Sequence, residues 1–145
     1  MAAALAEAVK AHDLPVKPLA DLVEARRIDL YADGLPGPAA VEGYLGETQS
    51  VLFQLAAMSV DKDAAPQAAA ASGLAGVAFG LARGLAAGQG KLVPPGETRA
   101  TMQALARRRL AEFRTVWPRC RAACGCVSSG GADGTLPQTV RAGPG

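Results

Sequence analysis

Residues 39–60 read AAVEGYLGETQSVLFQLAAMSV, and they show the clearest helical periodicity in this sequence. Polar residues such as Glu42, Glu47 and Gln54 separate the larger apolar residues. The apolar residues at helical spacing are Val41, Tyr44, Leu45, Leu52, Leu55 and Met58. Because this spacing places them on one side of a helix, the stretch predicts one long amphipathic helix.

Further helices are expected on both sides of this stretch, because apolar residues recur there at three- and four-residue spacing. The predicted ranges are 1–11, 18–30, 66–87 and a last helix from residue 98. The hydroxyl of Thr98 can cap the first turn of that last helix. Aromatic residues make up only 4% of the chain, which disfavours strands, so the sequence predicts an all-α protein.

Four glycines recur in the predicted helix 66–87, at Gly73, Gly76, Gly80 and Gly84. Each costs about 1 kcal/mol of helix propensity relative to alanine, so a structural or functional gain should offset them. One interpretation is a flat stripe that lets another helix approach closely. The other interpretation is a groove that receives a ligand.

The overall charge gives little information about partners. Fifteen lysines and arginines against thirteen acidic residues leave a formal charge of +2, too small to indicate a nucleic-acid partner. No run of about 18 to 20 uninterrupted apolar residues occurs, so we expect no transmembrane segment. The cysteines, crowded at Cys120, Cys124 and Cys126, are unlike a disulfide framework. We therefore expect a cytoplasmic protein, with attachment to a membrane surface as an alternative.

Residues suited to catalysis or metal binding are sparse. Asp61 and Asp63 lie two apart at a helix end, a spacing that suits a cap better than a Mg²⁺ site. The cysteine cluster lacks a fourth ligand for zinc, and His12 is the only histidine, so we expect neither a metal site nor a catalytic triad. The arginines at 107–109 share one helical turn and are interpreted as a solvated face, with a diphosphate clamp as the alternative.

A polar cluster marks the end of the second predicted helix. Its members are Glu24, Arg26, Arg27, Asp29 and Tyr31, with Asp33 just after. Arg26 and Asp29 are an i,i+3 pair on such a helix. One interpretation is a solvated helix end. The other is a cluster that faces a cavity between helices and binds or imitates a charged head group.

Three stretches of the chain resemble a known family. They are Asp13-Leu14-Pro15 followed by LVEARRIDLY at 22–31, EGYLGETQSVLFQLAA at 42–57, and GLAGVAFGLARGLAAGQGKLVP at 73–94. Together they resemble the squalene/phytoene synthase family, in particular a short bacterial branch with the motifs EAR-x-x-DLY and EGY-x-GET. The resemblance extends over residues 1–116.

The resemblance implies the all-α isoprenoid synthase fold, in which two prenyl diphosphates are joined head to head in a cavity between helices. In active members two aspartate-rich motifs hold Mg²⁺ ions that assist the departure of diphosphate. Neither motif occurs here: the first would precede Met1, and residues 80–88, where D-x-x-x-D would lie, read GLARGLAAG. We therefore expect a prenyltransferase-like protein of isoprenoid biosynthesis that is inactive and takes no cofactor in this form.

A non-enzymatic role is the alternative, because the family includes members without complete aspartate motifs. One of them is a respiratory complex I assembly factor, and a protein of that kind would act through a protein partner. In the enzymatic interpretation the ligand is a prenyl diphosphate.

The resemblance carries over only a few site residues. Arg26 and Asp29 match the family's R-x-x-D, and Tyr44 matches its tyrosine at a helix start, so these three are the expected substrate-binding residues. Pro94 matches the proline that ends the family's later stretch. Residues 48–53 stand where the family has V-A-G-x-V-G, so we expect Phe53 to fill space that active enzymes leave open.

Two regions are expected along the chain. Residues 1–116 resemble the C-terminal part of the family's domain, which implies that the chain begins inside that domain. Residues 117–145 carry all three cysteines and much of the glycine and proline, and they resemble no part of the family. Because they show no helical period, we expect a disordered tail or the product of a shifted reading frame.

Overall fold

The computed structural model describes residues 2–31 and 34–123, and every regular element among them is helical. The α-helices are α1 (Ala2–Ala11), α2 (Val16–Ala25), α3 (Pro38–Leu45), α4 (Val51–Val60), α5 (Ala65–Ala86) and α6 (Arg99–Ala123). Three short elements complete the set: the 3₁₀ turns η1 (Arg26–Leu30) and η3 (Gly90–Leu92), and the π turn η2 (Gly46–Ser50). The all-α prediction is confirmed.

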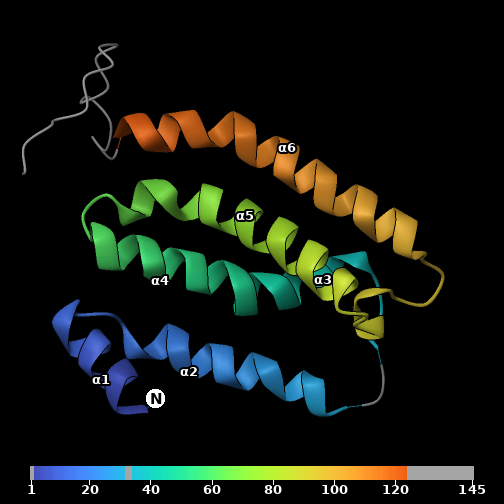
Figure 1. Ribbon diagram of the computed structural model, residues 1–145, viewed down its shortest axis with the longest axis horizontal. Coiled ribbons are helices and arrows are strands. Elements are labelled where there is room, and N and C mark those ends of the chain that lie inside the picture. Colours follow the sequence, from blue (N-terminus) through green and yellow to red (C-terminus); the bar gives the residue numbers. More distant parts are fainter. Residues whose placement is uncertain (1, 32–33, 124–145) are drawn as a thin grey trace, which may run out of the picture.

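Helix α5 lies at the centre of the arrangement, with α6 along one side and α4 along the other (Figure 1). Helices α1 and α2 lie beyond α4, and α2 contacts the π turn η2. The buried core forms where α3, α5, η3 and α6 meet, and Leu81, Leu92 and Met102 are its largest fully buried side chains. This core holds together the end of the molecule at which η1, η3 and α3 converge.

The predicted helix 39–60 is interrupted by the π turn η2, which separates α3 from α4. A π turn accommodates an additional residue, so the residues after it are rotated relative to those before it. The prediction for Leu52 was therefore wrong: this side chain is 46% exposed. Thr48, Gln49 and Ser50 of the turn are buried instead.

The glycine stripe of α5 permits close approach of the π turn, as one of the two interpretations predicted. A Cβ at Gly76 would collide with the backbone of Ser50, and one at Gly80 would lie 2.7 Å from Leu45 Cδ2. Gly73 has open space around its Cα, but its carbonyl accepts a hydrogen bond of 2.9 Å from Ser50 Oγ. The glycines therefore fix the position of η2 against α5.

Both predicted caps are present in the structure. Thr98 Oγ1 accepts a hydrogen bond of 3.2 Å from the backbone N–H of Thr101 at the start of α6. Asp61 Oδ1 accepts hydrogen bonds from the backbone N–H groups of Asp63 and Ala64, at 3.1 and 3.0 Å, in the turn before α5. Asp61 thus closes a turn, as its spacing from Asp63 predicted.

Helix α6 continues to Ala123, so the expectation that helical structure stops near residue 116 was wrong. Phe113, Trp117 and Cys120 continue the spacing of the helix, and the rings of Phe113 and Trp117 stack at 5.6 Å. Cys120 is buried, and its thiol donates to the carbonyl of Gln67 at 3.1 Å. Residues 124–145, with Cys124 and Cys126, lie outside the described part of the chain.

The arginine run on α6 does not form one solvated face. Arg107 and Arg108 are exposed, but Arg109 is half-buried and forms a two-bond ion pair with Glu42 of α3, at 2.5 and 2.9 Å. Arg109 also donates to Glu112 at 2.7 Å, and these hydrogen bonds raise the pKa of its guanidinium. Arg109 therefore joins α6 to α3.

Helix α5 is, among the described helices, the one that is long and apolar enough to cross a membrane by length and composition. Half of its most apolar window is buried inside the fold, as in the core helix of a globular protein. Length and composition in a single helix are weak evidence for a membrane span.

Candidate functional site

The three residues singled out in the sequence, Arg26, Asp29 and Tyr44, meet in space. The Tyr44 hydroxyl donates to Asp29 Oδ1 at 2.7 Å, across the space between α3 and η1. Arg26 Nη1 donates both to Asp29 Oδ2 at 3.2 Å and to the Tyr44 hydroxyl at 3.1 Å. The interpretation of a merely solvated helix end therefore fails for Arg26 and Asp29.

A fourth residue, Lys91 of η3, completes this polar cluster, and sequence reasoning missed it. Its ammonium donates to Asp29 Oδ1 and, at 3.4 Å, to the Tyr44 hydroxyl. Arg26 and Lys91 also lie near the Tyr44 ring, at 5.8 and 5.1 Å from its centroid, within reach of cation–π attraction. We call Arg26, Asp29, Tyr44 and Lys91 the polar cluster.

The electrostatics of the polar cluster follow from these contacts. Partial burial alone would raise the pKa of the Asp29 carboxyl, but hydrogen bonds from Lys91, Tyr44 and Arg26 outweigh burial and lower it. Burial, together with the hydrogen bond to Asp29, raises the pKa of the Tyr44 hydroxyl. Two cations and one carboxylate leave the polar cluster with a net positive charge.

A small cavity of about 150 Å³ opens beside the polar cluster. Its lining residues are Arg26, Tyr44, Gln49, Gly80, Arg83, Gly84, Ala87 and Gln89. None of these side chains is acidic. Gly80 and Gly84 belong to the glycine stripe, so the stripe serves close packing and also borders this cavity.

Two lining residues have unused hydrogen-bonding capacity. Arg83 forms no ion pair with any residue in the described ranges 2–31 and 34–123. Gln49 is only 8% exposed, yet its amide makes no hydrogen bond within those same ranges. Every fully buried side-chain nitrogen and oxygen in those ranges has a hydrogen-bond partner, so the Gln49 amide is open to the cavity, where a ligand between Gln49 and Arg83 would bond to both groups. We call this space the cationic cavity.

The other residues of the predicted polar cluster lie away from this cavity. Arg27 pairs with Glu24 at 2.7 Å on the exposed side of α2, and Tyr31 is an exposed side chain. Asp33 lies outside the described residues. Phe53 contacts Phe79 edge-to-face, with ring centroids 5.9 Å apart, and borders a separate, larger groove. Phe53 therefore narrows the space between α4 and α5 without filling it.

Comparison with protein families identifies a match to the squalene/phytoene synthase model over residues 1–87. The chain belongs to the squalene/phytoene synthase family. No curated protein and no solved structure matches it. The match includes Arg26, Asp29, Tyr44 and Arg83, whereas Lys91 lies beyond it. Nothing in the match supports the alternative role in respiratory complex I assembly.

The cationic cavity of this squalene/phytoene synthase family member does not fit Mg²⁺. In the described part of the chain, no three histidine, cysteine, aspartate or glutamate side chains are grouped so that they could hold a metal ion. Asp29 is a carboxylate that contacts the lining residues Arg26 and Tyr44, and hydrogen bonds from Lys91, Arg26 and Tyr44 already occupy its oxygens. Mg²⁺ requires oxygen ligands, whereas the charged side chains that line this cavity are the cations Arg26 and Arg83.

The stability of this family member should fall at acid pH because of Asp29. Its carboxyl pKa is lowered in the fold, so its contribution is complete above the ordinary value of 3.8 and is lost as the pH falls through the lower, folded value. We expect Asp29→Asn to be less stable than the wild type at neutral pH by about 1 kcal/mol, with the difference shrinking as the pH falls below 3.8 and the wild-type carboxyl becomes protonated. Thermal unfolding of both proteins across this range measures the effect.

Asp13→Asn is the control for that experiment, because Asp13 also pairs with a lysine, Lys62, but lies fully exposed. Exposed pairs contribute little to stability, so the pH dependence of Asp13→Asn should resemble that of the wild type more closely. An Asp29→Asn protein with the same acid sensitivity as the wild type would contradict the polar cluster as described.

Proposed function

We propose that this protein binds a prenyl diphosphate, holding the diphosphate group in the cationic cavity, and that it does so without condensing two such molecules. One observation carries the proposal: two arginines and two glutamines line the same cavity, and no carboxylate lines it. These residues are Arg26, Arg83, Gln49 and Gln89. Guanidinium groups suit phosphate oxygens because their N–H donors match them in pairs.

The size of the cationic cavity limits what it can take. At about 30 Å³ per water, its 150 Å³ corresponds to about five water molecules, enough for one phosphoryl group. Gln49 and Gln89 offer amide N–H donors to oxygens that the two arginines leave free. A second phosphoryl group would then lie at the mouth of the cavity, where Arg83 is exposed.

An apolar surface adjoins the cationic cavity on both helices. Phe53 of α4 follows Gln49 of the π turn η2 by four residues, and Phe79 precedes Arg83 by four residues on α5. The two phenylalanine rings contact each other and are each exposed in part. An isoprenoid chain attached to a bound diphosphate would cover these rings, which favours a prenyl diphosphate over a purely polar phosphate ester.

Binding without condensation follows from the donor set. Cleavage of the carbon–oxygen bond to diphosphate requires the charge of the departing group to be neutralised, and active family members use Mg²⁺ for this. Arg26, Lys91 and Arg83 supply positive charge here, but the carboxylates that would hold the metal ions against the diphosphate are missing from residues 80–88. The chain's residues therefore bind and orient the diphosphate.

Calorimetric titration of the purified protein in EDTA tests the proposal. Farnesyl diphosphate should bind more tightly than inorganic pyrophosphate, and farnesol, which lacks the diphosphate, should bind least. Arg83→Gln should weaken binding of both phosphates at least about tenfold, since a charge-assisted hydrogen bond contributes about 1.5 to 3 kcal/mol.

Arg108→Gln is the matched control, because Arg108 is an exposed arginine on α6 outside the cationic cavity. It should leave both affinities unchanged. Binding that depends on Mg²⁺, affinities that Arg83→Gln leaves intact, or a condensed prenyl product would each contradict the proposal.

A further inference from the structure

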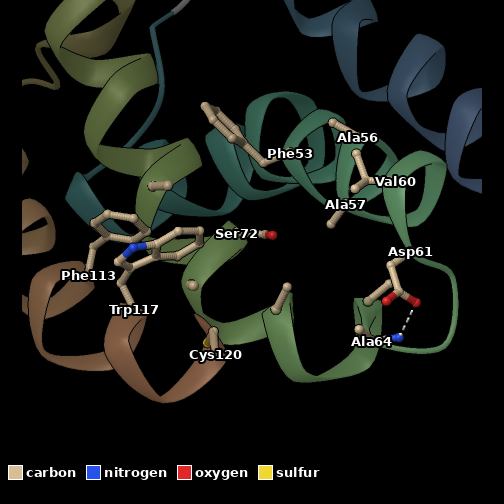
Figure 2. A pocket seen from close by; sticks show the side chains of 14 residues that line it. Phe53, Ala56, Ala57, Val60, Asp61, Ala64, Ser72, Phe113, Trp117 and Cys120 are labelled. Carbon is tan, nitrogen blue, oxygen red and sulfur yellow. Dashed lines mark hydrogen bonds between the residues drawn. The ribbon is translucent and has the colours of Figure 1, made fainter. Parts of the chain in front are cut away.

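A large apolar groove of about 810 Å³ runs over the face shared by α4, α5 and α6 (Figure 2). Its floor consists of small residues of α5. Phe53 and Val60 of α4 form one wall, and Phe113, Trp117 and Cys120 of α6 form the other. None of the polar-cluster residues borders it, so the groove is a separate surface.

Most of the α5 residues that floor the groove recur at a regular spacing, and Ala71 lines it beside them. Ala65, Ala68, Ser72 and Ala75 line it at alternating intervals of three and four residues. The same alternation continues through Phe79 to Ala82 and Ala86, which border a second hollow, of about 240 Å³, between α5 and α6. Both hollows therefore lie on one face of α5.

Helix α6 repeats the pattern opposite this floor. Arg99, Gln103 and Ala106 border the second hollow, and Phe113, Trp117 and Cys120 border the groove. Leu110, which is exposed, occupies the repeat position between Ala106 and Phe113. Alternating intervals of three and four on two neighbouring helices make the heptad seam into which a third helix packs.

The length and shape of this face suit a helix. The 22 residues of α5 extend over about 33 Å, so a helix of about six turns could lie along the seam. Alanines line most of the floor of the groove, which allows the backbone of an added helix to approach closely there. A bilayer surface is flat at this scale and would leave the floor uncovered.

The charge at the edge of the seam specifies the chemistry of that helix. Arg99, Arg107 and Arg114 are exposed along α6, and none of them forms an ion pair with a described residue. Asp61, the acidic residue that borders the groove, uses its carboxylate to cap the turn before α5. The open edge is thus basic.

We propose that the α5/α6 seam binds one amphipathic helix of a protein partner, apolar along a heptad stripe and acidic along the side that faces α6. The apolar stripe packs on Ala68, Ala75 and Trp117, while aspartate or glutamate side chains pair with the free arginines. No residue of the cationic cavity lines this seam, but Phe53 borders the groove and contacts Phe79, so an isoprenoid chain lying on these two rings would share part of the surface with the partner helix.

Trp117 provides the measurement, because it is the only tryptophan of the chain and is 46% exposed in the groove. The probe is a synthetic helix of about 22 residues with leucine and alanine on a heptad stripe and glutamate flanks. Titration should shift Trp117 fluorescence to shorter wavelength and saturate. A peptide with lysine in place of each glutamate should bind about tenfold more weakly, because Lys side chains would face Arg107 and Arg114.

One matched pair of variants and one double variant separate the surface from the fold. Ala68→Glu, on the floor of the seam, should abolish the shift, whereas Ala70→Glu should not, because Ala70 lies exposed on the opposite side of α5. Combined Arg107→Glu and Arg114→Glu should reverse the preference from the acidic to the basic peptide. Circular dichroism verifies that each variant is folded.

Three results would overturn the proposal. The first is equal binding of both peptides, with no reversal in the charge-reversed variant. The second is a Trp117 shift produced by vesicles of anionic phospholipid but not by the acidic peptide, which would indicate a membrane surface. The third is a concentration-dependent shift without peptide that coincides with a dimer in light scattering, which would indicate a second copy of this chain.

Discussion

Gly76→Ala should destabilise the fold by about 3 kcal/mol, although alanine is the better helix former. The added Cβ would collide with the backbone of Ser50, and a backbone in a buried π turn cannot move aside as the end of a flexible side chain can. Relief of the collision would separate α5 from η2. We therefore expect the midpoint of thermal unfolding to fall by about 10 °C.

Gly73→Ala is the matched control in the same helix. A Cβ at Gly73 meets no atom within 4 Å, and its carbonyl would still accept the hydrogen bond from Ser50. The helix propensity of alanine should then raise the stability by up to about 1 kcal/mol. Opposite signs at Gly76 and Gly73, measured by urea or thermal unfolding, are the expected outcome, and a stabilising Gly76→Ala would disprove the close approach.

Leu92→Ala should cost about 3 kcal/mol and should also weaken phosphate binding. Leu92 is fully buried and packs against Gly84 of α5, so truncation leaves a cavity in the core. The same residue ends η3, the short element that carries Lys91 to Asp29 and Tyr44. A loosened η3 would no longer hold the ammonium in place, so pyrophosphate affinity should fall together with stability.

Two further variants separate these effects. Leu30→Ala removes the same atoms from a leucine that is 84% exposed, and it should change stability by less than about 0.5 kcal/mol. Lys91→Ala removes the charge without the core side chain, so affinity should fall more than stability. If Leu92→Ala unfolds at the same urea concentration as the wild type, then η3 does not anchor the core.

The helical elements could be predicted from local signals in the sequence. Thr98 marks the start of α6 by its position before an apolar repeat, and Asp61 marks the turn before α5. The π turn could not be predicted in this way, because one additional residue leaves the spacing before and after it intact. The end of α6 was missed because residues 117–145, rich in glycine and proline, were interpreted as having no helical period, although Trp117 and Cys120 keep the helical spacing across Pro118.

The candidate site was predictable only where its residues lie in family motifs. Arg26, Asp29 and Tyr44 match such motifs, and the structure brings them together. Lys91 follows two glycines in a stretch whose sequence is typical of a loop between helices. The position of its side chain depends on the burial of the neighbouring Leu92. Arg83 is a lone charge in a run of alanine and glycine, so only the packing of α5 against η2 reveals that it borders a cavity.

The π turn at Gly46–Ser50 joins α3 directly to α4, and it determines how far α4 is rotated about the helix axis relative to α3. Before it, α3 directs Tyr44 towards the polar cluster; after it, α4 directs Phe53 towards the apolar groove. Loss of a single residue from the turn would restore a regular helix and rotate everything after it by about 100°. The geometry that relates the two surfaces is thus encoded in chain length at one point, so insertions and deletions there matter more than the identity of the residues.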